Sequence, residues 1–319
     1  MTKRFLKILF AQAFICFVFL APVTAQENKA FAVSNNKEII GEEIKSANLN
    51  EISSKKPAEN PKLQSFQNAL SQVLLKQNRK KDDLCDEKDA VASRILRDYG
   101  SIFLVVENVL PPPVCIFSSS ADVDKFQKQI GIAKSEIAGT HIELQPFAME
   151  ALLKAREEAQ KSGLTITPRD GAIAGRRGFS ETLRLWNSRF YPACDYWTKK
   201  GRLTEEQAAR LRSLPLREQV REVLELEKEG IYFNSSFSNS ILYSVAAPGT
   251  SQHLALLAFD VVEYNNEQVR TILAKYGWHR TVRNDQPHFT FLGHKEADLP
   301  KFGLREIKNA NGKFWIPNY

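Results

Sequence analysis

Leu257-Ala258-Phe259-Asp260-Val261-Val262 is a short apolar run with a single carboxylate inside it, and the predicted fold is built around it. A run of this length with aromatic and β-branched residues predicts a buried strand. Side chains alternate along a strand, so Asp260 shares a face with Ala258 and Val262. The stretch therefore predicts a strand that presents a carboxylate beside a small residue, which leaves room for a ligand.

A second polar stretch, Asp285-Gln286-Pro287-His288-Phe289, lies 25 residues further along the chain. His288 to Leu292 reads as another strand, with Phe289 and Phe291 directed to the side opposite His288 and into a core. Pro287 argues against a helix through Asp285 and His288. We therefore expect the polar side chains to come from neighbouring strands and not from one helix.

The rest of the chain alternates helical and strand-like patterns, which indicates an α+β fold. We expect a small antiparallel sheet that carries the site, flanked by helices, with an N-terminal extension made of helices and a strand. The predicted helices are one within Pro61–Lys80, Ala90–Tyr99, Ala121–Ile130, Pro146–Lys161, Ser180–Ser188, Thr204–Leu211, Leu216–Gly230 and Glu267–Lys275. The other predicted strands are Ile102–Val106, Ile142–Leu144, Leu164–Ile166 and Trp278–Val282.

The first 25 residues have the layout of a secretory signal peptide. A basic start precedes the apolar run Ile8 to Leu20, and Val23-Thr24-Ala25 is a small-residue cleavage pattern. An uncleaved membrane anchor is the alternative, but the run is shorter than the ~20 apolar residues of a typical span. We expect cleavage after Ala25, no stable membrane span afterwards, and a secreted, periplasmic or cell-envelope location.

Composition divides the remaining chain into three regions. Residues 26–60 are rich in Asn, Lys, Glu and Ser and predict a disordered linker. Residues 61–140 form an N-terminal extension or subdomain, and residues 141–319 form the domain with the polar stretches.

Loss of the three cations of the signal lowers the formal net charge from +7 to +4. This modest excess predicts no nucleic-acid partner. The positive charge suits a protein that works beside an anionic wall polymer. It is equally consistent with a soluble protein that merely has a basic surface.

Four cysteines are present, and Cys16 leaves with the signal peptide. Cys85, Cys115 and Cys194 remain in what we expect to be an oxidising compartment, which suggests one disulfide and one free thiol. Cys85 with Cys115 is the first choice because both flank one small region, although the other pairings stay open. The cysteines lack the CxxC spacing of a thiolate metal site.

His253, Asp260, Asp285 and His288 are the residue types that a catalytic zinc site needs. Two imidazoles and one carboxylate can hold zinc and leave a fourth position for water, while a second carboxylate takes that water's proton. Each residue also has a structural interpretation: a strand Asp that accepts backbone hydrogen bonds, or a His at a sheet edge. His279, which follows Trp278, is a further histidine in this region.

The spacing of these residues resembles the VanY-type D-alanyl-D-alanine carboxypeptidases, which belong to the LAS group of zinc peptidases that act on bacterial cell-wall peptides. That family's first motif is Ser-x-His-x-x-Gly-x-Ala-x-Asp, and its second is an acidic residue three positions before a His. Here the first motif is complete from Ser251 to Asp260 except that Leu256 replaces the glycine. The resemblance covers roughly Ile142 to Gly293 and includes Arg177 in a turn that carries an arginine in the family.

The resemblance implies a role for each matching residue. It implies zinc bound by His253, Asp260 and His288, Asp285 as catalytic acid and base, and Arg177 at the oxyanion or substrate. A carboxypeptidase also needs a cation for the terminal carboxylate, for which Arg177, Arg176 and Arg169 are the candidates. Ser251 is a candidate for binding the substrate or orienting a ligand, and a simple turn hydroxyl is the equal alternative. The resemblance implies a secreted zinc D,D-carboxypeptidase that removes terminal D-Ala from peptidoglycan stem peptides. The alternatives are a D,D-dipeptidase or endopeptidase of the same fold, or a zinc-binding but inactive wall-binding module, which Leu256 suggests.

Overall fold

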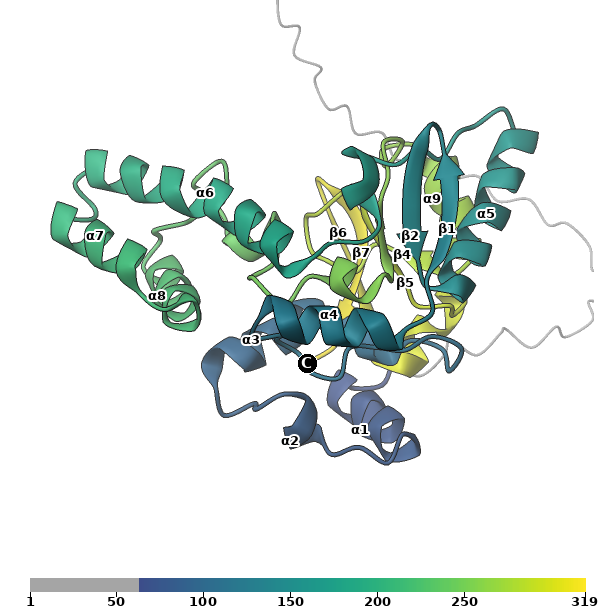
Figure 1. Cartoon of the computed structure of the whole chain (residues 1–319), viewed down its shortest axis with the longest axis horizontal. Helices are drawn as coiled ribbons and strands as arrows, with labels where there is room; N and C mark the ends of the chain where they lie inside the picture. The colour runs from purple at the N-terminus through teal and green to yellow at the C-terminus, as the bar shows by residue number, and fades with distance from the viewer. Residues whose placement is uncertain (1–62) are drawn as a thin grey trace, which may run out of the picture. The chain divides into compact units, whose positions relative to one another are not determined.

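The structure, a computed structural model, describes residues 63–319 and has the α+β fold that the sequence predicts (Figure 1). Its α-helices are α1 (Phe66–Lys76), α2 (Lys81–Leu84), α3 (Ala90–Tyr99), α4 (Ser120–Gln129), α5 (Pro146–Lys161), α6 (Phe179–Lys199), α7 (Glu205–Ser213), α8 (Leu216–Lys228) and α9 (Glu267–Lys275). Its strands are β1 (Ala133–Ile137), β2 (Thr140–Leu144), β3 (Ala258–Asp260), β4 (Trp278–His279), β5 (His288–Phe291), β6 (Leu304–Asn309) and β7 (Gly312–Pro317). Short 3-10 helices include η1 (Gly100–Leu104), η2 (Gly171–Ala174), η4 (Gln252–Ala255) and η5 (Glu296–Phe302).

The central sheet has the order β3–β5–β4, and both pairs of strands are antiparallel. Asp260 lies directly opposite His288 in this register, and Ala258 lies opposite Thr290. Because directly opposed residues of antiparallel strands share a face, Asp260 and His288 project to the same side. The predicted alternation is therefore confirmed, and it brings the two polar stretches together.

The other face of the central sheet is apolar and covered by helices. Phe291 makes an edge-to-face contact with Phe147 of α5 and packs against Trp278 of β4, with ring centroids 5.9 and 5.3 Å apart. Helices α5 and α9 pack against each other (Figure 1). Burial of these large rings holds the strands in one position and thus fixes the polar residues on the opposite face.

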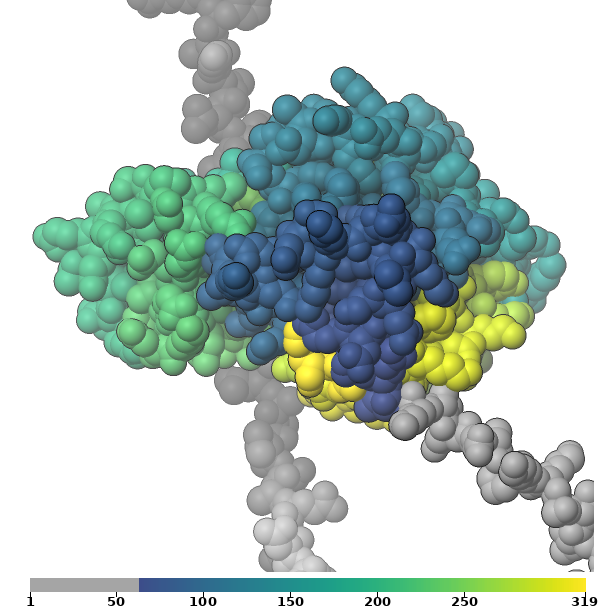
Figure 2. Space-filling model, turned by 90° about the horizontal axis from the view of Figure 1, so that it is seen from below, coloured from purple at the N-terminus to yellow at the C-terminus, as the bar shows by residue number. Residues whose placement is uncertain are grey.

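Two hydrophobic cores share helix α3. Its Ala92 and Leu96 pack in the core around the sheet, whereas Val91 and Ile95 pack in a second core built mainly from α6, α7 and α8. Figure 2 shows the N-terminal helices lying against the yellow C-terminal segments, in agreement with contacts of α1 with η5 and of α3 with β7. Residues on both sides of position 140 thus contribute to the core around the sheet.

Cys85 and Cys115 form a disulfide, as predicted. The bridge ties the end of α2 to the segment before α4, where Cys115 N–H also donates a hydrogen bond to the Leu84 carbonyl. Cys194 is a buried free thiol on α6. Its pKa is raised to about 11 by burial, which keeps it in the unreactive neutral form.

Three predicted strands differ from the structure. Ile102–Val106 was expected as a strand but mostly forms η1, because a short buried apolar run fits a helical turn as well as a strand. Leu164–Ile166 is not a strand: the chain pairs with β3 only through a single bridge at Pro168, whose missing N–H prevents a longer ladder. The strand predicted from Trp278 ends at His279.

Two hairpins were not predicted. Strands β1 and β2 meet at Ala138-Gly139, where both residues have positive φ, and β6 and β7 enclose a turn that ends at Asn311-Gly312. Such pairs favour the tight turns of antiparallel strands and were the available sequence signal. The second hairpin proves important for the site, because its turn contacts the loop before β5.

The predicted signal peptide and the whole of the predicted linker, including Cys16 and the cleavage position after Ala25, lie outside the described residues. Within residues 63–319, no helix combines the length and the apolar character needed to cross a membrane.

Leu256 stands where the motif that the sequence resembles has glycine, and it has a left-handed backbone conformation with φ of 57°. Glycine adopts this region freely, whereas a residue with a Cβ pays a steric cost there. The leucine side chain is fully buried in the core around the sheet. Its packing therefore offsets the backbone strain.

We predict that Leu256→Ala lowers the free energy of unfolding by about 2–5 kcal/mol, because the buried side chain is lost. Leu256→Gly removes the same side chain but relieves the backbone, and should be more stable than Leu256→Ala by about 1 kcal/mol. Urea denaturation of the two variants and the wild type measures both differences. A glycine variant less stable than the alanine variant would contradict this account.

Candidate metal centre

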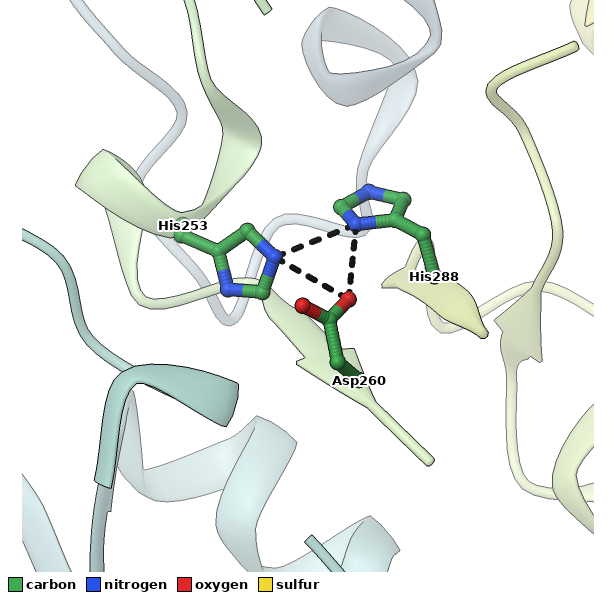
Figure 3. A group of neighbouring side chains, drawn as sticks. All are labelled: His253, Asp260 and His288. Carbon is green, nitrogen blue, oxygen red and sulfur yellow. Dashed lines mark hydrogen bonds and ion pairs between the residues drawn. The ribbon is translucent and has the colours of Figure 1, made fainter. Parts of the chain in front are cut away.

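Three side-chain atoms converge on one point from three segments of the chain (Figure 3). His253 comes from η4, Asp260 from β3 and His288 from β5. His253 Nε2 lies 3.1 Å from His288 Nδ1 and 3.3 Å from Asp260 Oδ1, and His288 Nδ1 lies 3.2 Å from the same oxygen. All three residues are buried. The residues predicted from the two motifs therefore form one compact group.

The outward nitrogen of His253 fixes the tautomer of its ring. Nδ1 lies 2.7 Å from the Gly175 carbonyl oxygen, which can only accept a hydrogen bond, so Nδ1 carries the proton. Nε2 consequently presents a lone pair to the centre of the group. Gly175 fits closely here, since a Cβ on it would lie 2.9 Å from the Glu143 carbonyl oxygen.

His288 is held in the same way by Gln252, a residue that the sequence analysis did not select. His288 Nε2 lies 2.9 Å from Gln252 Oε1. The amide of Gln252 is oriented in turn by Nε2 hydrogen bonds to the Tyr99 carbonyl and the Ser101 hydroxyl, at 3.0 and 3.1 Å. Its carbonyl end therefore faces His288, so Nε2 of the imidazole is the protonated nitrogen and Nδ1 has a lone pair directed at the group.

The geometry of the group suits a zinc ion. Zinc binds imidazole and carboxylate ligands at about 2.0–2.1 Å in a tetrahedron, which places the ligand atoms roughly 3.3 Å apart. The three separations of 3.1, 3.2 and 3.3 Å agree with this value. In both rings the N–H of the second nitrogen also donates a hydrogen bond to an oxygen acceptor, as in metal-bound histidines commonly. The buried His–Asp–His group is thus compatible with zinc.

The electrostatics of the group favour a bound cation. Burial, with the charge of Arg177 second, lowers the pKa of His253 to about 4, so the ring is neutral and able to ligate. Burial raises the pKa of Asp260, but its interactions with His253, His288 and Arg177 outweigh this and hold the pKa well below its usual range. Arg177 forms an ion pair with the outer oxygen Oδ2 of this carboxylate and leaves Oδ1 facing the histidines.

An open cleft of about 340 Å³ borders the group. Asp260 and Arg177 line it, and so does Asp285, the predicted acid and base. No group within residues 63–319 donates a hydrogen bond to the half-buried Asp285 carboxylate. Burial raises its pKa to about 6, which suits a group that must both accept and return a proton near neutral pH.

The loop that carries Asp285 is held by the turn of the β6–β7 hairpin. Asn309 Nδ2 donates to Asn284 Oδ1 at 2.8 Å, and Gln286 Nε2 donates to Asn311 Oδ1 at 2.8 Å. Both neighbours of Asp285 are therefore fixed by residues about 25 positions further along the chain. Sequence reasoning missed this support, because amide side chains in a turn do not reveal their distant partners.

The other predicted residues lie in different surroundings. Arg176 forms an ion pair with Glu143 at 2.7 Å and a hydrogen bond with Gln127, and it does not line the cleft. Ser251 is buried beside η4 and does not line the cleft either. Arg169 does line it, with Asp170 at 3.7 Å.

The comparisons with known proteins give a weak likeness to one kind of solved structure. No family model matches the chain, and no curated protein matches it. A structure of VanYB in complex with D-alanine-D-alanine is 17% identical and aligns over 55% of this chain and 86% of its own, with a TM-score of 0.33. A Zn(II) complex of a variant of the vancomycin-resistance D,D-pentapeptidase VanY is 16% identical over 55% of this chain and 84% of its own, with a TM-score of 0.31.

We predict that the purified protein binds one zinc ion per chain and that His253→Ala and His288→Ala abolish this stoichiometric binding, because each removes one of three ligand atoms. His141→Ala, which changes an exposed histidine on β2, is the matched control and should retain the metal. Elemental analysis after dialysis measures the content. Equal zinc in all four proteins would contradict the assignment.

Proposed function

We propose that this protein is a zinc-dependent D,D-carboxypeptidase, acting outside the cytoplasm, that removes terminal D-Ala from peptidoglycan stem peptides. The observation that carries the proposal is that the His–Asp–His group borders an open cleft, and that Asp285 in this cleft has no hydrogen-bond donor within residues 63–319. The motif from Ser251 to Asp260 supports the same peptidase class.

The chemistry that zinc supplies in such a site is the activation of a water molecule and the polarisation of a carbonyl oxygen. His253, Asp260 and His288 would hold the ion. Asp285 accepts the proton of the attacking water and returns it to the leaving amine. A raised pKa makes the second transfer easier, since the protonated carboxyl remains accessible near neutral pH.

Arg177 is the residue that we expect to contact the reacting carbonyl group of the substrate. Its Nε donates to the Ile173 carbonyl at 2.9 Å, which fixes the guanidinium, and an Nη group binds Asp260. A fixed guanidinium at the cleft wall can donate to an oxygen that gains negative charge during the attack. The same ion pair orients Asp260, so Arg177 serves both the group and the substrate.

A carboxypeptidase also needs a cation for the free carboxylate of its substrate. Three arginines line the cleft: Arg177 is paired with Asp260, and Arg169 lies near Asp170. Arg189 of α6 is the third, and within residues 63–319 it has no carboxylate partner. A planar guanidinium without an internal acid is well suited to bind a carboxylate through two hydrogen bonds. Arg189 is therefore our choice for this role, ahead of Arg176.

Leu256 does not favour an inactive wall-binding module. Its side chain is buried in the core and is not among the residues that line the cleft. The substitution for glycine therefore places no bulk where a substrate would bind. The presence of Asp285 in the cleft, which a binding module would not need, favours the enzyme.

We predict that Asp285→Asn lowers kcat for D-Ala release from a peptide that ends in D-Ala-D-Ala by about 10²–10⁴-fold, because the amide cannot accept the proton. Zinc content should be unchanged, since Asp285 is not in the ligand group. Asp170→Asn, which changes an exposed acid of the same cleft, is the matched control and should keep most of the activity.

Release of D-Ala and the product masses are measured with and without a chelator. A zinc-loaded wild type that releases no D-Ala would refute the proposed reaction, and cleavage at another bond would replace it with a dipeptidase or endopeptidase. Full activity of Asp285→Asn would remove Asp285 from the mechanism.

We further predict that Arg189→Gln reduces the preference for a free carboxylate. The wild type should cleave a D-Ala-D-Ala peptide with a free C-terminus with a kcat/KM at least tenfold above that of its C-terminal amide, because one charged hydrogen bond contributes roughly 1.5–3 kcal/mol. The variant should cleave the acid and the amide at similar rates. Arg184→Gln, an exposed arginine on the same helix, should discriminate as the wild type does. An unchanged preference in Arg189→Gln would exclude the role.

A further inference from the structure

A second cavity, of about 250 Å³, lies between α9, β4 and the β6–β7 hairpin. None of the three residues of the metal group lines it, and neither does Asp285. We call this cavity the hairpin pocket. Its charged lining consists of four cationic and two acidic side chains, which leaves two positive charges uncompensated.

The two arginines and Glu267 are the charged residues of the lining that have no ion-pair partner within residues 63–319. Lys313 is paired with Glu296 at 2.5 Å, and Lys308 is paired with Glu306 at 2.9 Å. Arg270 and Arg280 have no carboxylate within ion-pair distance in residues 63–319. The unpaired charges of the lining are thus two guanidinium groups and the exposed carboxylate of Glu267, and an anionic ligand would neutralise the remaining positive charge.

Arg280 is unusual because it is only 5% exposed. Its guanidinium lies over the Phe314 ring at 4.5 Å and donates to the Asn311 carbonyl at 3.3 Å. Burial, with the charge of Arg270 second, lowers its pKa to about 10. A buried cation held by one weak neutral hydrogen bond retains most of its donor capacity for another partner.

Two other buried groups that line the pocket also lack a partner in the described part of the chain. They are Trp278 Nε1 and His279 Nδ1. Trp278 Nε1 is a donor. His279 Nε2 donates to the His294 carbonyl at 2.9 Å, and burial lowers the pKa of this ring to about 4, so the ring is neutral and Nδ1 is an acceptor. Both atoms belong to residues of the pocket lining, which therefore contains a buried donor and a buried acceptor that no described group satisfies.

We propose that the hairpin pocket binds a phosphate-type oxyanion, as inorganic phosphate or a phosphate monoester. Two guanidinium groups match the oxygen atoms of such an anion. A P–OH group, or a free hydroxyl in the organic part of a monoester, donates a hydrogen bond to His279 Nδ1. A carboxylate or a sulfate ion has no proton to donate in this way. The site is separate from the peptide cleft and does not depend on the proposed peptidase activity.

Isothermal titration of the zinc-loaded protein with inorganic phosphate, at constant ionic strength, tests the proposal. We expect saturable binding that is at least severalfold tighter than that of sulfate, an anion of similar shape without a proton to donate at neutral pH. Titration with glycerol phosphate distinguishes a site for phosphate monoesters from a site for the free ion. Only a pocket with room for the ester group should bind glycerol phosphate as tightly as inorganic phosphate. No saturable binding of either phosphate compound, or equal affinity for sulfate, would overturn the proposal.

Substitutions test whether the anion binds in the hairpin pocket. Arg270→Gln should weaken phosphate binding roughly tenfold, because a charged hydrogen bond to the anion is lost. Arg270 is half-buried, and its guanidinium also donates to the Tyr264 carbonyl at 3.0 Å. Lys128→Gln, which removes an exposed charge on α4, is the matched control and should bind as the wild type does. An anion held at the metal group would survive Arg270→Gln, so unchanged binding in this variant would refute the site.

Discussion

The register between β3 and β5 is the constraint on which the site depends. It sets Asp260 opposite His288, and the packing of Phe291 against Trp278 and Phe147 on the other face prevents the strands from slipping. A shift by one residue would turn the polar side chains into the core, because strand side chains alternate. The hydrophobic face of a three-stranded sheet therefore determines the geometry of the polar face.

The site also requires that each imidazole directs its unprotonated nitrogen at the centre of the His–Asp–His group. The Gly175 carbonyl and the Gln252 amide each accept the outward N–H, and Gln252 is itself fixed by the segment around Tyr99 and Ser101. The N-terminal helices are thus part of the support for the site as well as of the core. Such outer contacts orient metal ligands and raise their basicity.

Sequence reasoning predicted the local patterns well and the distant contacts poorly. Strand alternation placed Asp260 and His288 correctly, and helix α5 follows its predicted bounds. Ile102–Val106 was assigned to a strand, although most of it forms η1, because a short buried apolar run fits either structure. The amides of Asn309 and Asn311 could not be connected to the loop of Asp285, since that contact depends on how the C-terminal hairpin packs.

In the site that we propose, two ring nitrogens and one carboxylate oxygen would hold a zinc ion and leave one position for water. X-ray absorption at the zinc edge of the metal-loaded protein measures this set of ligands. We expect two imidazole ligands and two oxygen ligands at about 2.0–2.1 Å. A spectrum with sulfur at about 2.3 Å, or with fewer than two imidazoles, would contradict it.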